Sequence, residues 1–377
     1  MFLDGVRGIA ALYVVLLHAA QTVESNFQPL PLRPLGAWIR APLMFGHVAV
    51  SVFIVLSGYC LMLPIAQDPS LNMRGGVSRY LMRRAKRILP PYYAALALCL
   101  LLIAMVPSLN RPGESTWSVA LPAFTPGALI SHLTMTHYFS REWASKIDPP
   151  MWSVAPEWYI YLLFPFVLLP IWRRAGMVAA LGFAACMSLG PQLLIGRAIL
   201  HLHLWYALLF TVGAAGTMVT FAPLHSRLRA MCWGAIAAIL GIAAAGLVCF
   251  RNDWCLGHPY VSDLLVGGFA AALIVHCAKD RDARITRFLG SWPLAWLGGI
   301  SYSLYLIHNP LVAMFSAGLV SIGLGNDARF FAVVLLGSGV SILAAYLFHL
   351  TFERPFMASR PLRSGEVLAA AVASPAP

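Results

Sequence analysis

Two ionisable residues flank an apolar run close to the start of the sequence. Arg7 and His18 stand on either side of GIAALYVVLL, in which Tyr13 is the single polar side chain. In a helix their eleven-residue separation corresponds to about 16 Å, which would place His18 near the middle of a membrane. A hydrogen bond across a helix bundle could satisfy such an imidazole, but its depth favours a role in taking and returning a proton. His18 is therefore our first candidate catalytic residue.

A dense group of cations follows in the segment SRYLMRRAKRILPPYY. Arg83, Arg84, Lys86 and Arg87 lie within five positions, and a helix would present them on overlapping faces. One interpretation is a positive cluster that only fixes the orientation of a membrane helix. The other is a phosphate-binding site, because arginine offers permanently charged, bidentate donors. Four cations exceed what orientation requires.

Two further apolar segments carry polar groups that need an explanation. Glu157 lies in PPMWSVAPEWYIYLLFP, where a carboxylate is costly without a partner, although it also suits a helix N-terminus. In SYSLYLIHNP, the side chains of Tyr302, Tyr305 and His308 repeat every third residue and form one polar stripe. Glu157 and His308 join the candidate site residues.

Other polar or small residues receive a structural interpretation. Ser57 and Gly58 lie inside an apolar segment, and small residues of this kind allow close helix packing in membranes. His276 and His349 are isolated near segment ends, and we assign them no role.

The composition indicates what must position these residues. Of the 377 residues, 60% are hydrophobic and 11% are charged, and the mean hydropathy is +0.76, whereas soluble domains are about 25% charged. The sequence predicts an all-α, polytopic membrane bundle of about ten transmembrane helices. Their expected ranges are 8–24, 43–65, 88–107, 152–172, 175–195, 203–222, 231–249, 260–278, 293–322 and 329–350.

The basic residues predict an orientation. With the N-terminus inside and the helices alternating, 18 of the 26 Lys and Arg residues fall on the cytoplasmic side, so both termini are expected there. This distribution explains the net charge of +12 without a nucleic-acid partner. The longest loop, 108–151, would be external and able to fold over the bundle. We expect one transmembrane domain over 1–356 and a disordered cytoplasmic tail over 357–377.

Six motifs together resemble the membrane-bound acyltransferase family 3, integral membrane O-acyltransferases that modify cell-surface polysaccharides and related acceptors. They occur in family order across about residues 3–356. The motifs are LDGVRGIAALYVVLLHA, FIVLSGY, RRAKRILPPYY, MWSVAPEWYIYLLFP, SYSLYLIHNP and FERPF. The family's Arg and His pattern falls on Arg7 and His18, and its paired-arginine motif on Arg84 and Arg87.

The resemblance implies a central polar cavity in a multi-pass protein of the cell inner membrane. It also implies an acyl-CoA donor, with acetyl-CoA expected, on the cytoplasmic side, no metal, and a carbohydrate or lipid-linked glycan acceptor reached from outside. His18 would act as general base on the acceptor hydroxyl, or form an acyl-histidine intermediate. Arg7 would hold the donor or stabilise negative charge, and Glu157 would orient or balance a partner.

Two other classes of function use the same residues. A proton-coupled transporter or exporter could use the intramembrane His, Arg and Glu as a relay. A non-catalytic envelope protein could use the cationic cluster to bind anionic membrane lipid. Consumption of an acyl thioester separates the enzyme from both.

Overall fold

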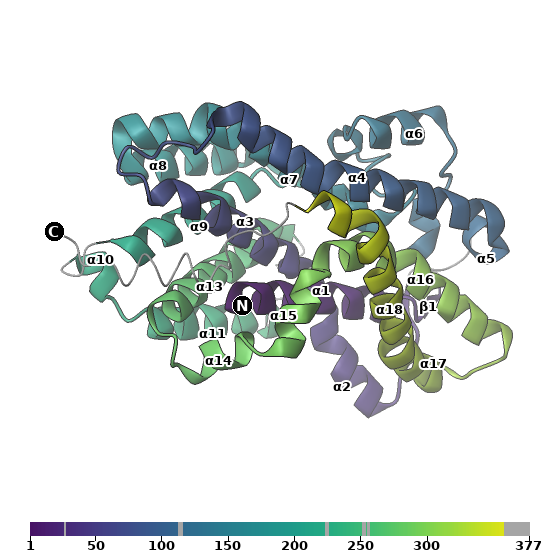
Figure 1. Cartoon of the computed structure of the whole chain (residues 1–377). Coiled ribbons are helices and arrows are strands. Elements are labelled where there is room, and N and C mark those ends of the chain that lie inside the picture. Colours follow the sequence, from purple (N-terminus) through teal and green to yellow (C-terminus); the bar gives the residue numbers. More distant parts are fainter. Residues whose placement is uncertain (26–27, 112–115, 223–225, 251–253, 255–256, 358–377) are drawn as a thin grey trace.

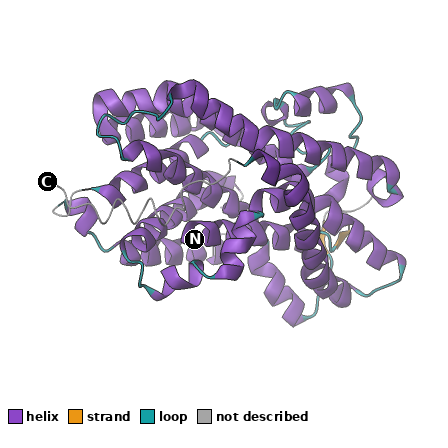
Figure 2. Ribbon diagram, in the orientation of Figure 1, coloured by secondary structure: helices purple, strands orange, loops and turns teal. Residues whose placement is uncertain are grey.

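The computed structural model describes residues 1–25, 28–111, 116–222, 226–250, 254 and 257–357. Apart from Met357, the predicted tail lies outside these residues. The described chain is almost entirely helical, with one pair of two-residue antiparallel strands, β1 (Glu24–Ser25) and β2 (Gln28–Pro29) (Figure 2). The all-α prediction is thus confirmed.

The longer helices correspond to the predicted apolar segments, and five short ones lie between those segments or at their edges, at residues 34–43, 107–110, 126–133, 227–230 and 284–289. The helices are α1 (Phe2–Gln21), α2 (Pro34–Leu43), α3 (Ala49–Ala66), α4 (Gly76–Met105), α5 (Pro107–Asn110), α6 (Pro126–Leu133), α7 (Val154–Leu163), α8 (Leu169–Ile195), α9 (Tyr206–Phe221), α10 (Arg227–Ala230), α11 (Trp233–Phe250), α13 (Pro259–Lys279), α14 (Arg284–Leu289), α15 (Trp292–Gly299), α16 (Ser301–Ser321), α17 (Asn326–Ala332) and α18 (Ser338–Phe348).

Seven helical stretches among the described residues are long and apolar enough to cross a membrane, so the protein is a multi-pass membrane protein. One of them, Pro149–Leu202, covers two predicted segments and breaks at Gly176, whose φ of 86° is readily adopted by glycine. Two shorter apolar helices, Tyr206–Phe221 and Trp233–Leu247, match two more segments. The count of ten and the orientation of the termini stay predictions.

Helix α1 lies inside the bundle and packs against α3, α15 and α16. Two glycines allow its backbone to touch its neighbours. A Cβ on Gly5 would lie 1.7 Å from the carbonyl oxygen of Leu289, and one on Gly298 would lie 1.9 Å from that of Asp4. The GVRG sequence around Arg7 therefore serves close packing as well as carrying a charge.

Helices α3 and α9 are held together in the same way. A Cβ on Gly58 would lie 1.9 Å from the Phe210 carbonyl oxygen, and one on Gly213 would lie 2.0 Å from that of Val55. The packing interpretation of Gly58 is confirmed.

Substituting Gly58 with alanine is expected to destabilise the bundle by roughly 1–3 kcal/mol, because a backbone carbonyl occupies the space that the methyl group needs. Gly182→Ala is the matched control, since no atom lies within 4 Å of a Cβ there. Thermal unfolding of the two purified variants in one detergent measures the difference. Equal unfolding temperatures would contradict the close approach of α3 and α9.

The predicted loop 108–151 is folded rather than extended. It contains α5, α6 and three short helical turns, η2 (Thr116–Ala120), η3 (His137–Phe139) and η4 (Pro149–Ser153). It packs on α4, where the Tyr92 hydroxyl donates to the His132 carbonyl oxygen (3.1 Å) and the Tyr93 hydroxyl to that of Leu133 (2.7 Å).

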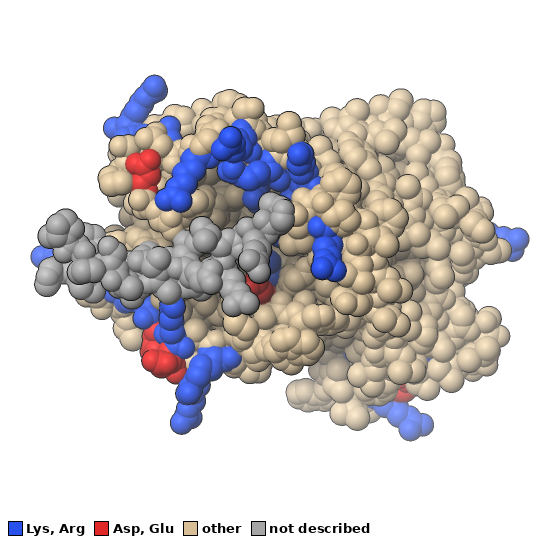
Figure 3. Space-filling view, viewed as in Figure 1, with Lys and Arg blue, Asp and Glu red and all other residues tan. Residues whose placement is uncertain are grey.

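Charged side chains gather at one end of the molecule. Figure 3 shows Lys and Arg mostly over the left half of this face, where Figure 1 places α10, α14 and the first half of α4. Helix α1 runs from this side towards the end that carries β1, α5 and α17 (Figure 1). The side of the membrane on which these charges lie stays a prediction.

Candidate active site

Two predicted site residues from opposite ends of the chain meet inside the bundle. The ring centroids of His18 on α1 and His308 on α16 are 5.1 Å apart. His308 is fully buried and His18 is half-buried. The two imidazoles thus form one unit, with accessible surface on the His18 side. We refer to them as the histidine pair.

Backbone contacts fix the proton position on His308. Its Nδ1 lies 3.0 Å from the Leu304 carbonyl oxygen and 2.9 Å from that of Tyr305. Carbonyl oxygens only accept, so in the neutral ring Nδ1 carries the hydrogen and Nε2 keeps its lone pair. That Nε2 is buried and has no hydrogen-bond partner in the described part of the chain. His308 therefore presents a free proton acceptor in the bundle interior.

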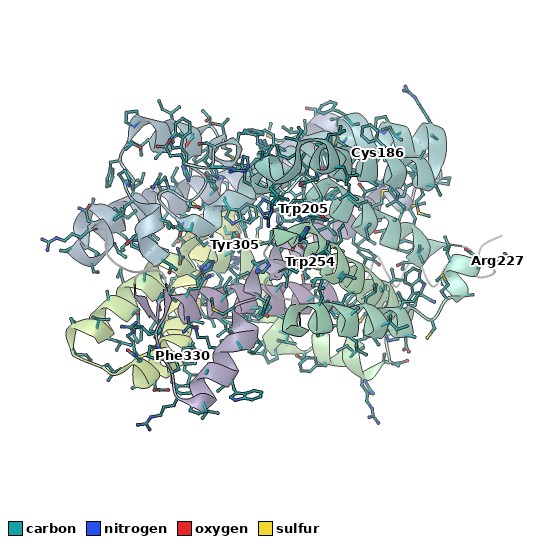
Figure 4. All side chains as sticks on the ribbon, turned by 180° about the vertical axis from the view of Figure 1, so that it is seen from behind. Cys186, Trp205, Arg227, Trp254, Tyr305 and Phe330 are labelled. Atoms are coloured by element: carbon teal, nitrogen blue, oxygen red, sulfur yellow. The ribbon has the colours of Figure 1, made fainter. Side chains whose placement is uncertain are left out.

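Tyr305 braces this region of α16. Its hydroxyl donates to the Pro150 carbonyl oxygen (2.9 Å) and lies 2.5 Å from the Ser153 hydroxyl. Figure 4 shows Tyr305 in the interior, between Phe330 at one end of the molecule and Arg227 at the other. The polar stripe on α16 thus ties the helix carrying His308 to η4.

Arg7 lies at the other end of α1 from His18. Its guanidinium donates to Asp4 (3.1 Å) on the same helix and to the Cys60 sulfur (3.1 Å) on α3. It is also close enough to interact electrostatically with Arg87 on α4. Arg7 is therefore part of a cationic group rather than a direct partner of His18.

The four predicted cations on α4 divide between two faces. Arg84 and Arg87, three residues apart, are half-buried, whereas Arg83 and Lys86 are exposed. The Arg84 and Arg87 guanidiniums interact electrostatically with each other, and Arg84 Nε is buried without a partner among the described residues. We call Arg7, Arg84 and Arg87 the inner arginines.

Glu157 on α7 is linked to the inner arginines through Tyr161. Its Oε1 accepts hydrogen bonds from the Ser57 hydroxyl (2.9 Å) and the Tyr161 hydroxyl. Tyr161 in turn interacts electrostatically with Arg84 and Arg87. Ser57, which the sequence suggested only as a packing residue, thus binds the carboxylate directly. Of the four predicted catalytic residues, His18 and His308 lie against each other, whereas Tyr161 interacts with both Arg7 and Glu157.

The sequence analysis missed a second carboxylate near the inner arginines. Glu353 is 2% exposed, and its Oε2 accepts from the Ser303 hydroxyl (2.6 Å) and lies 2.8 Å from His349 Nδ1. It also attracts Arg87 electrostatically. The FERPF motif contains Glu353 and could have indicated it, but the sequence analysis assigned a role neither to Glu353 nor to His349.

Asp148, just before the segment that starts at Pro149, was also missed. It is fully buried, and its Oδ1 accepts from the Asn309 side chain at 2.9 Å, next to His308. Burial raises the pKa of Asp148 to about 8, so the carboxyl is mostly protonated at neutral pH. It therefore links loop and α16 without placing a charge near the histidine pair.

Two cavities stand out, and neither is lined by the histidine pair or the inner arginines. One, of about 290 Å³, lies between Gln192, Arg197 and Tyr260. The other, of about 220 Å³, lies near Thr22, one turn beyond His18. A central cavity that joins the inner arginines to His18 stays a prediction.

Comparison with known proteins decides the class of protein. A family model described as an acyltransferase domain matches residues 2–350, which is nearly the whole chain. The chain belongs to this acyltransferase family. Five of the six motifs lie within the matched residues, and FERPF follows just after them. Membership favours the enzyme over the transporter and the lipid-binding protein.

Curated relatives of this acyltransferase share less than a third of its residues. Acyltransferase MdmB of Streptomyces mycarofaciens is 25% identical over 94% of this chain and 91% of its own length. Peptidoglycan O-acetyltransferase OatA of Listeria monocytogenes is 22% identical and O-acetyltransferase OatA of Staphylococcus aureus is 23% identical. These two matches cover 83% and 82% of this chain. The chain spans about half the length of either OatA protein. No solved structure matches it.

Proposed function

We propose that this acyltransferase moves an acyl group, with acetyl the expected one, from cytoplasmic acyl-CoA to a hydroxyl of an envelope glycan. The observation that carries the proposal is the placement of two groups along α1. The inner arginines lie at one end and the histidine pair lies near the other. The names of the two OatA relatives support O-acetylation, and the multi-pass fold supports the cell inner membrane as the location.

Donor binding follows from the inner arginines. Arg84 and Arg87 would bind the phosphates of coenzyme A with charge-assisted hydrogen bonds, and the exposed Arg83 and Lys86 would attract the anion to the entrance. Arg7 and His18 are eleven positions apart, which corresponds to about 16 Å along a helix. The flexible arm that joins the phosphates of coenzyme A to its thiol would span this distance.

In the proposed transfer step the histidine pair acts as the base, and every proton and bond is accounted for. His18 takes the proton of the acceptor hydroxyl as its oxygen attacks the thioester carbonyl. The carbon–oxygen bond forms, the carbon–sulfur bond breaks, and the thiolate leaves and recovers the proton. The unpartnered Nε2 of His308 would accept the proton from His18 or hold its ring in place. Glu157 would position Tyr161 and Ser57 beside the arginines.

Release of coenzyme A thiol tests the proposed activity. The purified protein in nanodiscs is incubated with acetyl-CoA and an envelope glycan fraction, and free thiol and glycan acetyl groups are measured. We expect equal amounts of both products. Thiol release without glycan acetylation would contradict the acceptor class, and no thiol release would contradict the donor.

A further inference from the structure

The cavity of about 220 Å³ lies past the histidine pair, at the C-terminal end of α1. Thr22, which lines it, is the residue after α1, and its N–H donates to the His18 carbonyl oxygen (3.2 Å). Ala313 and Ser316, also in the lining, lie one to two helical turns beyond His308 on α16. The remaining walls come from residues near α5 and η2 and from α17, all at the end of the bundle opposite the inner arginines (Figure 1).

Arg329 lines this cavity, and no carboxylate among the described residues forms an ion pair with it. The residue is 7% exposed, and its Nε is buried with no hydrogen-bond partner in the described ranges. Its one hydrogen bond there runs from the guanidinium to the Thr22 carbonyl oxygen at 3.5 Å. A buried guanidinium with five donors is costly unless an anion pairs with it. The free donors and the charge therefore point to a bound oxyanion.

The remaining lining suits a sugar. Thr22, Ser108, Thr116, Ser316 and Trp117 are among the residues that line the cavity. The hydroxyls of Thr22, Thr116 and Ser316 donate to backbone carbonyl oxygens and can each still accept a hydrogen bond from a ligand hydroxyl. The Trp117 indole N–H donates to the Leu109 carbonyl oxygen (3.0 Å), which holds the ring in place. Pockets for drug-sized ligands have about 300–1,000 Å³, so this cavity takes one sugar unit rather than a long chain.

We propose that this cavity binds the acceptor through an anionic sugar unit, whose carboxylate or phosphate pairs with Arg329. The inference rests on the proposed function, because it places the acceptor next to the histidine pair. A sugar held between Thr22 and Ser316 would lie about one helical turn, roughly 5 Å, from the level of His18. A hydroxyl on that unit or on the next one could then reach the histidine pair.

Binding of two small sugars in the absence of donor tests the proposal. Methyl glucuronide and methyl glucoside share a ring and differ in one carboxylate. We expect the wild-type protein in nanodiscs of zwitterionic lipid to bind the glucuronide at least about tenfold more tightly, which corresponds to about 1.4 kcal/mol. Arg329→Gln should remove the difference, whereas Arg33→Gln, which removes an exposed charge near α17, should keep it.

Each other result overturns the inference. Equal binding of the two sugars by the wild type, or a preference that survives Arg329→Gln, would exclude Arg329 as the recognition group. If Arg329→Gln does not fold, Arg329→Lys replaces it, because lysine keeps the charge but loses bidentate pairing. The inference then requires that the wild type prefers the glucuronide and that Arg329→Lys reduces this preference. Displacement of the glucuronide by phosphatidylglycerol in the nanodisc would assign the site to lipid headgroups.

This test does not depend on catalysis. A protein that binds methyl glucuronide through Arg329 but releases no thiol from acetyl-CoA would contradict the proposed function and keep the anion site. A protein that acetylates glycans without any preference for the glucuronide would contradict the anion site alone.

Discussion

Replacing His18 with alanine is expected to lower acyl transfer by about 10²–10⁴-fold, the usual contribution of a general base. The side chain lies against His308, which is fully buried, so His18 is the member of the histidine pair with accessible surface for the acceptor hydroxyl. Transfer from acetyl-CoA is measured for wild type and variant after both are shown to insert and accumulate equally in the membrane.

The control for His18 is another half-buried histidine of the bundle. His276→Ala removes an imidazole from α13 and should leave the rate within about twofold of wild type, because a substitution away from the reacting atoms does not change the barrier. The double variant His18→Ala, His308→Ala should lose little more than His18→Ala alone, because residues that act as one unit are not additive. Undiminished transfer by His18→Ala would exclude the proposed base.

Replacing Arg87 with glutamine is expected to raise the KM for acetyl-CoA by about 10–100-fold. One charge-assisted hydrogen bond contributes about 1.5–3 kcal/mol, and Arg87 interacts with Arg84, Arg7 and Glu353 in the half-buried group. Arg84→Gln should have an effect of similar size. Initial rates over a range of acetyl-CoA concentrations, with the acceptor held in excess, give the KM of each variant.

Arg83→Gln is the matched control, because it removes the same charge from the same turn of α4 but on the exposed face. We expect a change of about threefold or less that disappears in high salt, since exposed charges are screened. Equal effects of Arg83→Gln and Arg87→Gln at high salt would contradict direct binding by the inner arginines. In that case the cluster would only set the orientation of α4.

The sequence was sufficient to predict much of the fold. The apolar ranges predicted the long helices because a helix must cover about 20 apolar residues to span a bilayer. The predicted break between 172 and 175 lies next to the kink at Gly176. His18 was found because an imidazole in an apolar helix is costly and needs a reason. Arg87 was found because four cations within five positions exceed what orientation requires.

Contacts between distant segments could not be predicted in the same way. Spacing along α16 indicated a polar stripe, but not that His308 would meet His18 from the first helix. Glu353 follows the last apolar segment, where a carboxylate is ordinary, and only its burial against Ser303 distinguishes it. Arg329 is one of the eight Lys and Arg residues that the predicted orientation leaves outside. Only the structure shows that its Nε is buried without a hydrogen-bond partner among the described residues.

Transfer across the membrane tests the central claim most directly. Labelled acetyl-CoA is supplied only to the cytoplasmic face of inside-out vesicles that contain the protein and enclose an acetylatable glycan. The account predicts labelled glycan inside vesicles with the wild type and a loss of about 10²–10⁴-fold with His18→Ala. Label that appears only when donor and glycan share one face, or that is independent of His18, would contradict a reaction at the histidine pair fed through the inner arginines.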